Sequence, residues 1–374
     1  MTRDLKILSL SLLVWGFGEG LFIFFQPLLL RQIGADPILI GTILGASAFA
    51  TGIAQIPFGW ISDHVGARPL LWGSWILGTM ATIIIAASSS VIGFTIGLVL
   101  YGFSGSIMAP LNSYFSTIRG KLSLSRVIAF ATSAYNIGAI AGPILGGFIA
   151  EKTGLKTVYI FSCFVFFLST AIVFFVKDHH SKSTETEHPS HKTAHYSRPF
   201  ISFIVITFLI LFSTNLPLPL ASNYLYTMKG LNYAQVGLLG TMISVGYVVF
   251  VTFISKREPK LGLLLPLLGM FVFSLVVWRS GSFIFFIGVY LFGCGPRLVR
   301  SMSAAYARPL LHEARVGTGY GLLETSNSFA LMLSPVAAGW LIQRDPELIY
   351  PIAMGLLIII LIIAWVSFKK IEQK

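Results

Sequence analysis

Twelve apolar stretches, each long enough to cross a lipid bilayer as a helix, follow one another along the 374 residues of this chain. A membrane-spanning helix needs about 20 apolar residues. Charged residues make up 11% of the chain, against about 25% in soluble proteins. We therefore predict an all-α membrane protein whose spans are residues 5–33, 38–62, 69–89, 91–118, 124–150, 156–177, 199–227, 232–255, 260–279, 281–308, 316–343 and 347–368.

One long polar segment separates the sixth span from the seventh. Residues 177–198 contain five of the seven histidines, together with serine, threonine and glutamate. Such a composition favours an unfolded linker, although histidine-rich runs also bind metal ions. We predict no metal site and divide the chain into two six-helix bundles, residues 1–177 and 199–374, joined by a linker at 178–198.

Lysine and arginine are distributed unevenly between the two sets of loops. If the N-terminus is cytoplasmic, the loops on its side carry 18 of the 26 basic residues and the opposite loops carry 6. Basic residues favour cytoplasmic loops, so we predict a cell-membrane protein with both termini and the linker in the cytoplasm. The net charge of +12 then reflects topology, and we expect no nucleic-acid partner.

The two halves of the sequence resemble each other. An offset of 196 residues aligns Gly41 with Gly237, and an offset of 192 aligns Pro143 with Pro335. A register that drifts slowly over several spans indicates duplicated halves, which are typical of transporters. We therefore predict two pseudo-symmetric bundles.

The loop between the second and third spans reads GWISDHVGARP over residues 59–69. Gly59, Asp63, Gly66 and Arg68 resemble the signature loop of the major facilitator superfamily, in which glycines permit a tight turn. The loop departs from that pattern at His64 and Ala67. We assign the four matching residues to gating, with Asp63 meeting the positive N-terminal end of the eleventh span.

The fifth span contains a second motif, GAIAGPILGG, at residues 138–147. It resembles a glycine- and proline-rich motif of the drug-antiporter branch of the same superfamily. Small residues at this spacing let two helices pack backbone to backbone, which is also the simpler interpretation. We assign a conformational role to Gly138, Gly142, Pro143, Gly146, Gly147 and the repeat-related Pro335. The arginine that this branch commonly carries in the fourth span is replaced here by Leu98.

Four charged residues lie well inside predicted spans, away from the span ends: Glu19, Glu324, Arg297 and Arg300. Charges inside a membrane are costly and mark functional sites by default, although a pair of buried salt bridges would be a structural alternative. We predict that Arg300 pairs with Glu324. Glu19 has no cation in its own span, so desolvation favours its neutral form. We therefore assign Glu19 as the proton-carrying group and Glu324 as the second proton-coupling candidate, with a structural or gating role.

The predicted substrate site combines these charges with polar and aromatic residues at similar depth. In the arrangement that the resemblance implies, spans 1, 4, 7 and 10 line the central cavity. Other aromatic residues, Trp15 and Tyr135 among them, are candidates for the same cavity, with packing as the simpler interpretation. The predicted substrate-binding residues are Glu19, Gln26, Tyr101, Asn112, Asn215, Asn223, Arg297 and Arg300.

No catalytic motif accompanies these residues, since the sequence has neither a phosphate-binding glycine-rich loop with lysine nor an HExxH pair. We expect a transporter rather than an enzyme, with no cofactor. The resemblance implies alternating access, and we predict proton-coupled export of a small amphipathic or organic-anion compound by a monomer in contact with membrane lipid. The alternatives are a facilitator or symporter for a sugar or carboxylate solute, and a transporter-like receptor or lipid scramblase.

Overall fold

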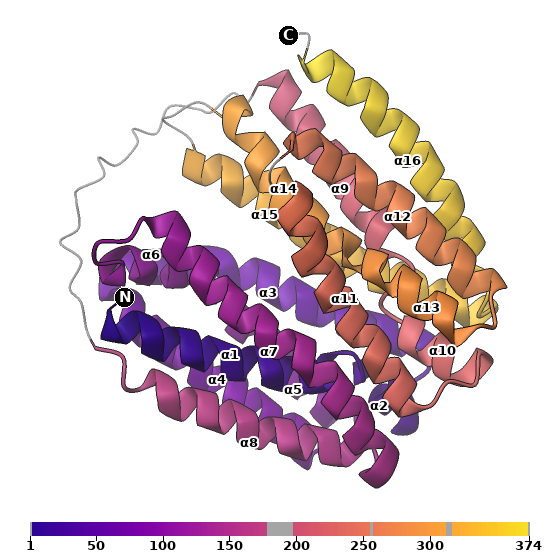
Figure 1. Cartoon of the computed structure of the whole chain (residues 1–374), viewed down its shortest axis with the longest axis horizontal. Coiled ribbons are helices and arrows are strands. Elements are labelled where there is room, and N and C mark those ends of the chain that lie inside the picture. Colours follow the sequence, from indigo (N-terminus) through magenta and orange to yellow (C-terminus); the bar gives the residue numbers. More distant parts are fainter. Residues whose placement is uncertain (1, 178–196, 255–256, 312–315, 373–374) are drawn as a thin grey trace.

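The computed structural model describes residues 2–177, 197–254, 257–311 and 316–372, and its regular structure over these ranges is helical (Figure 1). In chain order the helices are α1 (Arg3–Ile23), α2 (Gln26–Gln32), α3 (Pro37–Val65), α4 (Ala67–Ala87), α5 (Val91–Ser104), α6 (Met108–Ile118), α7 (Leu124–Thr153), α8 (Leu155–Val173), α9 (Arg198–Asn215), α10 (Ala221–Met228), α11 (Tyr233–Ile254), α12 (Pro259–Arg279), α13 (Phe283–Tyr290), α14 (Gly295–Ala307), α15 (Val316–Arg344) and α16 (Ile349–Glu372). Short 3₁₀ segments lie at Gly105–Ile107, Leu291–Cys294 and Arg308–Leu310.

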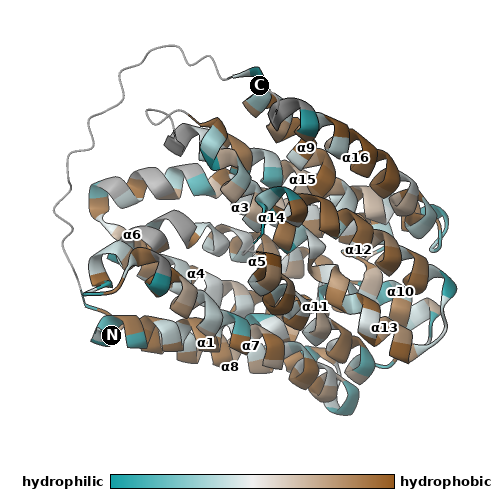
Figure 2. Ribbon diagram, turned by 45° about the horizontal axis from the view of Figure 1, so that its top comes forward, coloured by the Kyte–Doolittle hydropathy of each residue, from teal (hydrophilic) through white to brown (hydrophobic). Residues whose placement is uncertain are grey.

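These helices confirm the predicted all-α membrane fold. Within the described residues, ten segments are long and apolar enough to cross a membrane, and the shorter apolar segment Val91–Ile107 forms the first part of the fourth predicted span. Figure 2 shows hydrophobic colour on the outward surfaces of helices such as α12 and α16. Large apolar side chains point outward, including Phe164 (69% exposed) and Ile284 (76% exposed), as expected where a surface faces lipid.

Spans 1, 4, 7 and 10 are each built from two helices rather than one. The pairs are α1 with α2, α5 with α6, α9 with α10, and α13 with α14. Proline cannot donate a backbone hydrogen bond and disrupts the preceding turn; Pro27, Pro217 and Pro296 lie at three of these breaks. In every three-span unit the first span is the broken one, as expected for duplicated halves with discontinuous helices around a central site.

The helices form two bundles, α1–α8 and α9–α16, which lie against each other (Figure 1). We call the side of the molecule on which α2, α7, α10 and α15 end the distal side, and the opposite side, with both termini, the proximal side. The predicted linker, apart from Ser197 and Arg198, lies outside the described residues.

Two helix pairs form most of the contact between the bundles, α3 with α15 and α7 with α11. A methyl group at Gly147 of α7 would lie 2.6 Å from the Tyr233 carbonyl oxygen of α11. A methyl group at Gly41 of α3 would collide with the Pro335 carbonyl oxygen of α15. Both contacts lie towards the distal side, and they involve the fifth-span motif and its repeat-related counterpart.

The same glycine motif also packs α7 against α1 within the first bundle. A methyl group at Gly142 would lie 2.6 Å from the Phe17 carbonyl oxygen and 2.7 Å from the Gly20 Cα. The two backbones are thus in direct contact, as small residues at this spacing allow. This close approach determines which side chains of α1 and α7 meet at mid-membrane depth.

Candidate functional site

Glu19 lies in the last two turns of α1, beside the helix that the glycine motif brings into contact with it. The Tyr135 hydroxyl, one turn before Gly138 on α7, donates a hydrogen bond to Glu19 Oε2 at 3.0 Å. Hydrogen bonds to a charged acceptor are stronger than those between neutral groups. The sequence predicted Glu19 as a membrane carboxylate, and the structure adds a tyrosine as its direct partner.

Aromatic side chains surround the same carboxylate on its other side. Trp15 and Tyr101 both lie within interaction range of Glu19. The Trp15 and Tyr101 rings are stacked with centroids 6.3 Å apart, and the Phe22 ring packs edge-on against Tyr101 at 5.3 Å. The carboxylate therefore lies among aromatic side chains, of which Tyr135, Tyr101 and Trp15 carry polar groups that can donate to it.

Arg297 approaches Glu19 from the second bundle, at the start of α14. The two side chains do not form an ion pair, but the arginine is close enough for its charge to act on the carboxylate. Both line a small cavity of about 50 Å³ between the bundles. Its walls also include Gly20, Ile23, Phe24, Tyr135, Ala139, Pro143, Gly240, Ile243 and Ser244.

Arg300 and Glu324 form the predicted pair, at 2.8 Å from Arg300 Nη2 to Glu324 Oε2, and the Arg300 Nε donates to the same oxygen at 3.0 Å. This confirms the predicted contact. The side chains are 39% and 28% exposed, respectively. The pair is therefore not the fully buried ion pair that the sequence suggested, and partial exposure reduces its contribution to stability.

The structure places Gln26, Asn215 and Asn223 outside the cavity around Glu19. Asn215 Nδ2 donates to Ser334 Oγ at 2.6 Å within the second bundle. Asn223 is buried, and its Nδ2 donates to the Pro27 carbonyl at 3.0 Å. Gln26 is buried at the start of α2. The side chain of Asn112 lies outside the described part of the structure.

The structure describes only part of the predicted gating loop at residues 59–69. Gly66 ends α3 with a φ of +84°, a conformation that favours glycine. Arg68 Nε donates to the Val176 carbonyl at 3.1 Å, so this arginine fastens the loop to the end of α8. The surroundings of Gly59, the side chain of Asp63 and the side chains at the start of span 11, which Asp63 was predicted to meet, lie outside the described part of the structure.

Hydrogen bonds between the bundles are present on the distal side. Glu151 Oε2, near the end of α7, accepts from the Tyr233 backbone N–H at 2.9 Å. This N–H belongs to the first residue of α11, where helix N–H groups lack intrahelical partners. The Asn223–Pro27 bond joins α10 to α2 on the same side. Nearer to mid-depth, Thr241 of α11 donates to the Ile140 carbonyl of α7 at 2.9 Å.

Two residues, one in the cavity and one in the contact between the bundles, were not among the residues predicted from the sequence. Ser244 lines the cavity and falls on the same helical face as Gly237 and Gly240, a spacing of three to four residues that could have indicated it. Glu151 carries no local signal, because its partner is 82 residues away in the other bundle.

Comparisons with known proteins agree on the family. The Major Facilitator Superfamily profile matches residues 8–295 and, in a second match, residues 203–374. An uncharacterized MFS-type transporter of Methanocaldococcus jannaschii is 23% identical over 91% of this chain and 92% of its own length. A Yersinia pestis protein provisionally named multidrug resistance protein MdtD is 22% identical over 42% of this chain and 34% of its own length.

The fold is also found in solved transporter structures. The nucleoside transporter NupG superposes with a TM-score of 0.77 at 10% identity, covering 98% of this chain and 99% of that one. Family and fold are thus those of membrane transporters rather than enzymes, and the transported species is a small molecule. With its paired bundles, its broken helices around a central carboxylate and this match over most of its length, the chain belongs to the Major Facilitator Superfamily.

Proposed function

We propose that this transporter exports a small amphipathic or organic-anion compound in exchange for protons, with Glu19 as the proton-carrying group. The observation that carries the proposal is the position of Glu19, which is hydrogen-bonded to Tyr135 in one bundle and faces Arg297 of the other without an ion pair. A carboxylate in such a setting can exist in both protonation states, as a coupling group must.

The charge of Glu19 would change how strongly the two bundles attract each other at this point. Glu19 belongs to the first bundle and Arg297 to the second, so ionised Glu19 attracts Arg297 across the interface. Protonation removes that attraction. Proton binding would therefore change the relative stability of two arrangements of the bundles, as alternating access requires.

The size of the cavity supports a proton site. Ligand pockets usually measure about 300–1,000 Å³, whereas the space beside Glu19 measures about 50 Å³. It has room for a few water molecules. In this conformation the cavity suits proton transfer, and a substrate would occupy it only after the bundles have moved apart.

The direction of transport is proposed on two grounds. One is the fifth-span motif, which resembles that of drug antiporters and forms the close distal contact at Gly147. The other is the relative named as a multidrug resistance protein, which matches less than half of this chain.

A facilitator or symporter for a sugar or carboxylate solute is the second candidate. The side chain of Arg297 is exposed and, within the described structure, forms no ion pair, so it is available to bind an anion. Arg300 is less suited to this role because Glu324 already accepts two of its hydrogen bonds.

The test is transport in proteoliposomes with an imposed pH gradient, with ethidium and carboxyfluorescein as amphipathic and anionic probes. Glu19→Gln should abolish gradient-driven transport while retaining probe exchange without a gradient. Glu324→Gln makes the same chemical change in another membrane carboxylate and should keep the pH dependence. If transport by Glu19→Gln keeps its pH dependence, the proton role is wrong and the facilitator function is favoured.

A further inference from the structure

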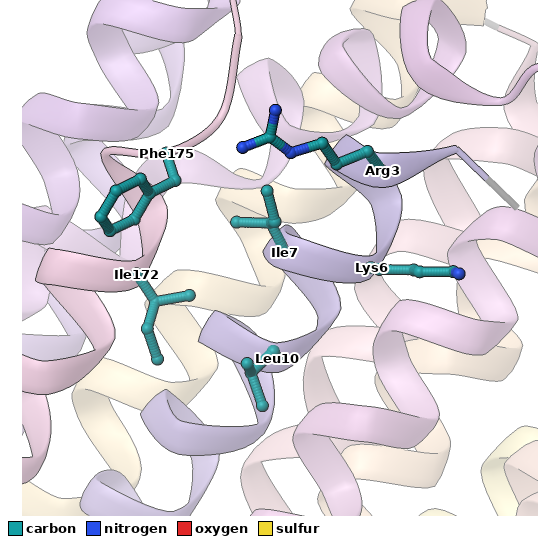
Figure 3. Close-up of a pocket in the computed structure, with 6 residues that line it drawn as sticks. All are labelled: Arg3, Lys6, Ile7, Leu10, Ile172 and Phe175. Carbon is teal, nitrogen blue, oxygen red and sulfur yellow. The ribbon is translucent and has the colours of Figure 1, made fainter.

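A second hollow lies far from the central cavity, on the outer surface of the first bundle. It is formed where the start of α1 meets the end of α8, and Figure 3 shows the six side chains that line it. They are Arg3, Lys6, Ile7, Leu10, Ile172 and Phe175. The hollow measures about 750 Å³, within the range of about 300–1,000 Å³ seen for ligand sites.

The lining of this hollow is divided into a cationic part and an apolar part. Arg3 and Lys6 are exposed and lie on the first two turns of α1, with Arg3 leaning over Ile7 towards Phe175 (Figure 3). Leu10 lies seven residues further along the helix, about 10 Å deeper at 1.5 Å per residue. Leu10 and Phe175 are 52% and 67% exposed.

Neither cation is neutralised by the protein in the described structure, since the side chains of Arg3 and Lys6 form no hydrogen bond or ion pair there. The neighbouring acidic residue, Asp4, is buried and accepts a hydrogen bond from the Lys177 backbone N–H at 3.4 Å. Its carboxylate thus has a partner of its own at the end of α8 and, among the described residues, forms no ion pair with Arg3 or Lys6.

Hydrogen bonds to neighbouring helices hold the two chain segments that line the hollow. The Tyr114 hydroxyl donates to the Lys177 carbonyl at 2.7 Å, and Arg68 Nε donates to the Val176 carbonyl at 3.1 Å. Thr2 Oγ1 donates to the Ile118 carbonyl at 2.8 Å. These bonds hold the start of α1 and the end of α8 together, so the hollow is a preformed feature of the first bundle.

We infer that this hollow binds an anionic phospholipid from the membrane leaflet on the proximal side. Arg3 and Lys6 bind the phosphate and the negatively charged headgroup, and an acyl chain lies along Ile7, Leu10, Ile172 and Phe175. Charge complementarity selects the ligand class, because Arg3 extends over the apolar side chains and Lys6, on the next turn of α1, adds a second cation at the edge of the hollow (Figure 3). Basic pockets beside membrane helices bind anionic headgroups on the cytoplasmic side, which the basic-residue count predicts to be the proximal side.

The test uses the full chain in detergent micelles, titrated with dioleoylphosphatidylglycerol and followed by native mass spectrometry. A basic residue near an anionic surface contributes about 1 kcal/mol, a factor of about five. Arg3→Gln and Lys6→Gln should therefore each weaken binding about fivefold, and the double variant about 25-fold. The matched control is Arg119→Gln with Lys121→Gln, which removes two exposed cations on the same side of the molecule but not from the hollow.

Two further arms identify the source of the phosphate group and the part played by the acyl chain. Dioleoylphosphatidylcholine has the same chains without net charge and should bind at least tenfold more weakly, while soluble glycerophosphoglycerol should not compete. Phe175→Ala should weaken binding of the lipid several-fold, and because the side chain is exposed its loss should leave the thermal unfolding midpoint unchanged.

The inference is wrong if the control pair loses as much affinity as the Arg3 and Lys6 pair, since the cations would then act only through general surface charge. It is also wrong if phosphatidylcholine binds as tightly as phosphatidylglycerol, or if soluble glycerophosphoglycerol competes fully. None of these outcomes depends on proton coupling or on transport.

Discussion

The hydrogen bond from the Tyr233 backbone to Glu151 predicts a measurable shift in the balance between conformations. It joins α7 of the first bundle to the first residue of α11 in the second, at 2.9 Å. If the protein works by the proposed alternating access, the distal ends separate when it opens to that side, so this bond would exist in one state and be broken in the other. Weakening it should raise the population of the distally open state.

The magnitude follows from the type of contact. Glu151 is exposed, and a carboxylate at an exposed helix N-terminus contributes about 0.3–1 kcal/mol. Glu151→Gln keeps an acceptor oxygen and removes the charge, so it should shift the equilibrium about two- to fivefold. Glu151→Ala also removes the hydrogen bond, which adds about 0.5–1.5 kcal/mol and brings the total shift to about fourfold or more.

Spin labels at positions 32 and 227, one near the distal end of each bundle, would report the change as a distance distribution. The labels require a background without Cys163 and Cys294. Both variants should gain population at the longer distance, and Glu151→Ala should gain more. Glu258→Gln is the matched control, because Glu258 precedes α12 without capping it through its side chain.

The reasoning is refuted if neither Glu151 variant changes the distribution, or if Glu258→Gln changes it equally. Salt gives an independent check, since screening weakens exposed charge interactions. The difference between wild type and Glu151→Gln should therefore shrink as ionic strength rises.

Three other predictions concern topology, packing and the second ion pair. Of three variants with a single cysteine at position 229, 191 or 256, only the variant at 229 should react with an impermeant thiol reagent in intact cells. Labelling at 191 would show that the orientation is the opposite of the predicted one. Gly142→Leu should lower the thermal unfolding midpoint strongly, because a side chain there meets the Phe17 carbonyl oxygen. Gly355→Leu is the control and should leave the midpoint unchanged, because no atom lies within 4 Å of an added Cβ at that position. Glu324→Gln should cost about 1–2 kcal/mol in chemical denaturation rather than the 3–5 kcal/mol of a fully buried pair, and a loss above about 3 kcal/mol would contradict the partial exposure of the pair.

Much of the fold could be predicted because membrane spans are a local property of the sequence. Each span needs its own apolar run, and the bilayer gives no alternative for the backbone hydrogen bonds. The predicted 38–62 corresponds to the observed Pro37–Val65, and 232–255 to Tyr233–Ile254. The pairing of Arg300 with Glu324 was also predictable, since buried charges require partners of opposite sign.

The sequence by itself determined the helical membrane fold, the family and the charged residues that the membrane makes costly. Only the tertiary structure decided that Glu19 meets Tyr135, that Arg297 faces it without an ion pair, and that Asn215 and Asn223 bond elsewhere. The physical reason is the difference between depth and direction. Hydropathy gives the depth of a residue in the membrane, whereas the direction of its side chain depends on helix rotation and crossing, which are set by backbone contacts such as Gly142 against Phe17.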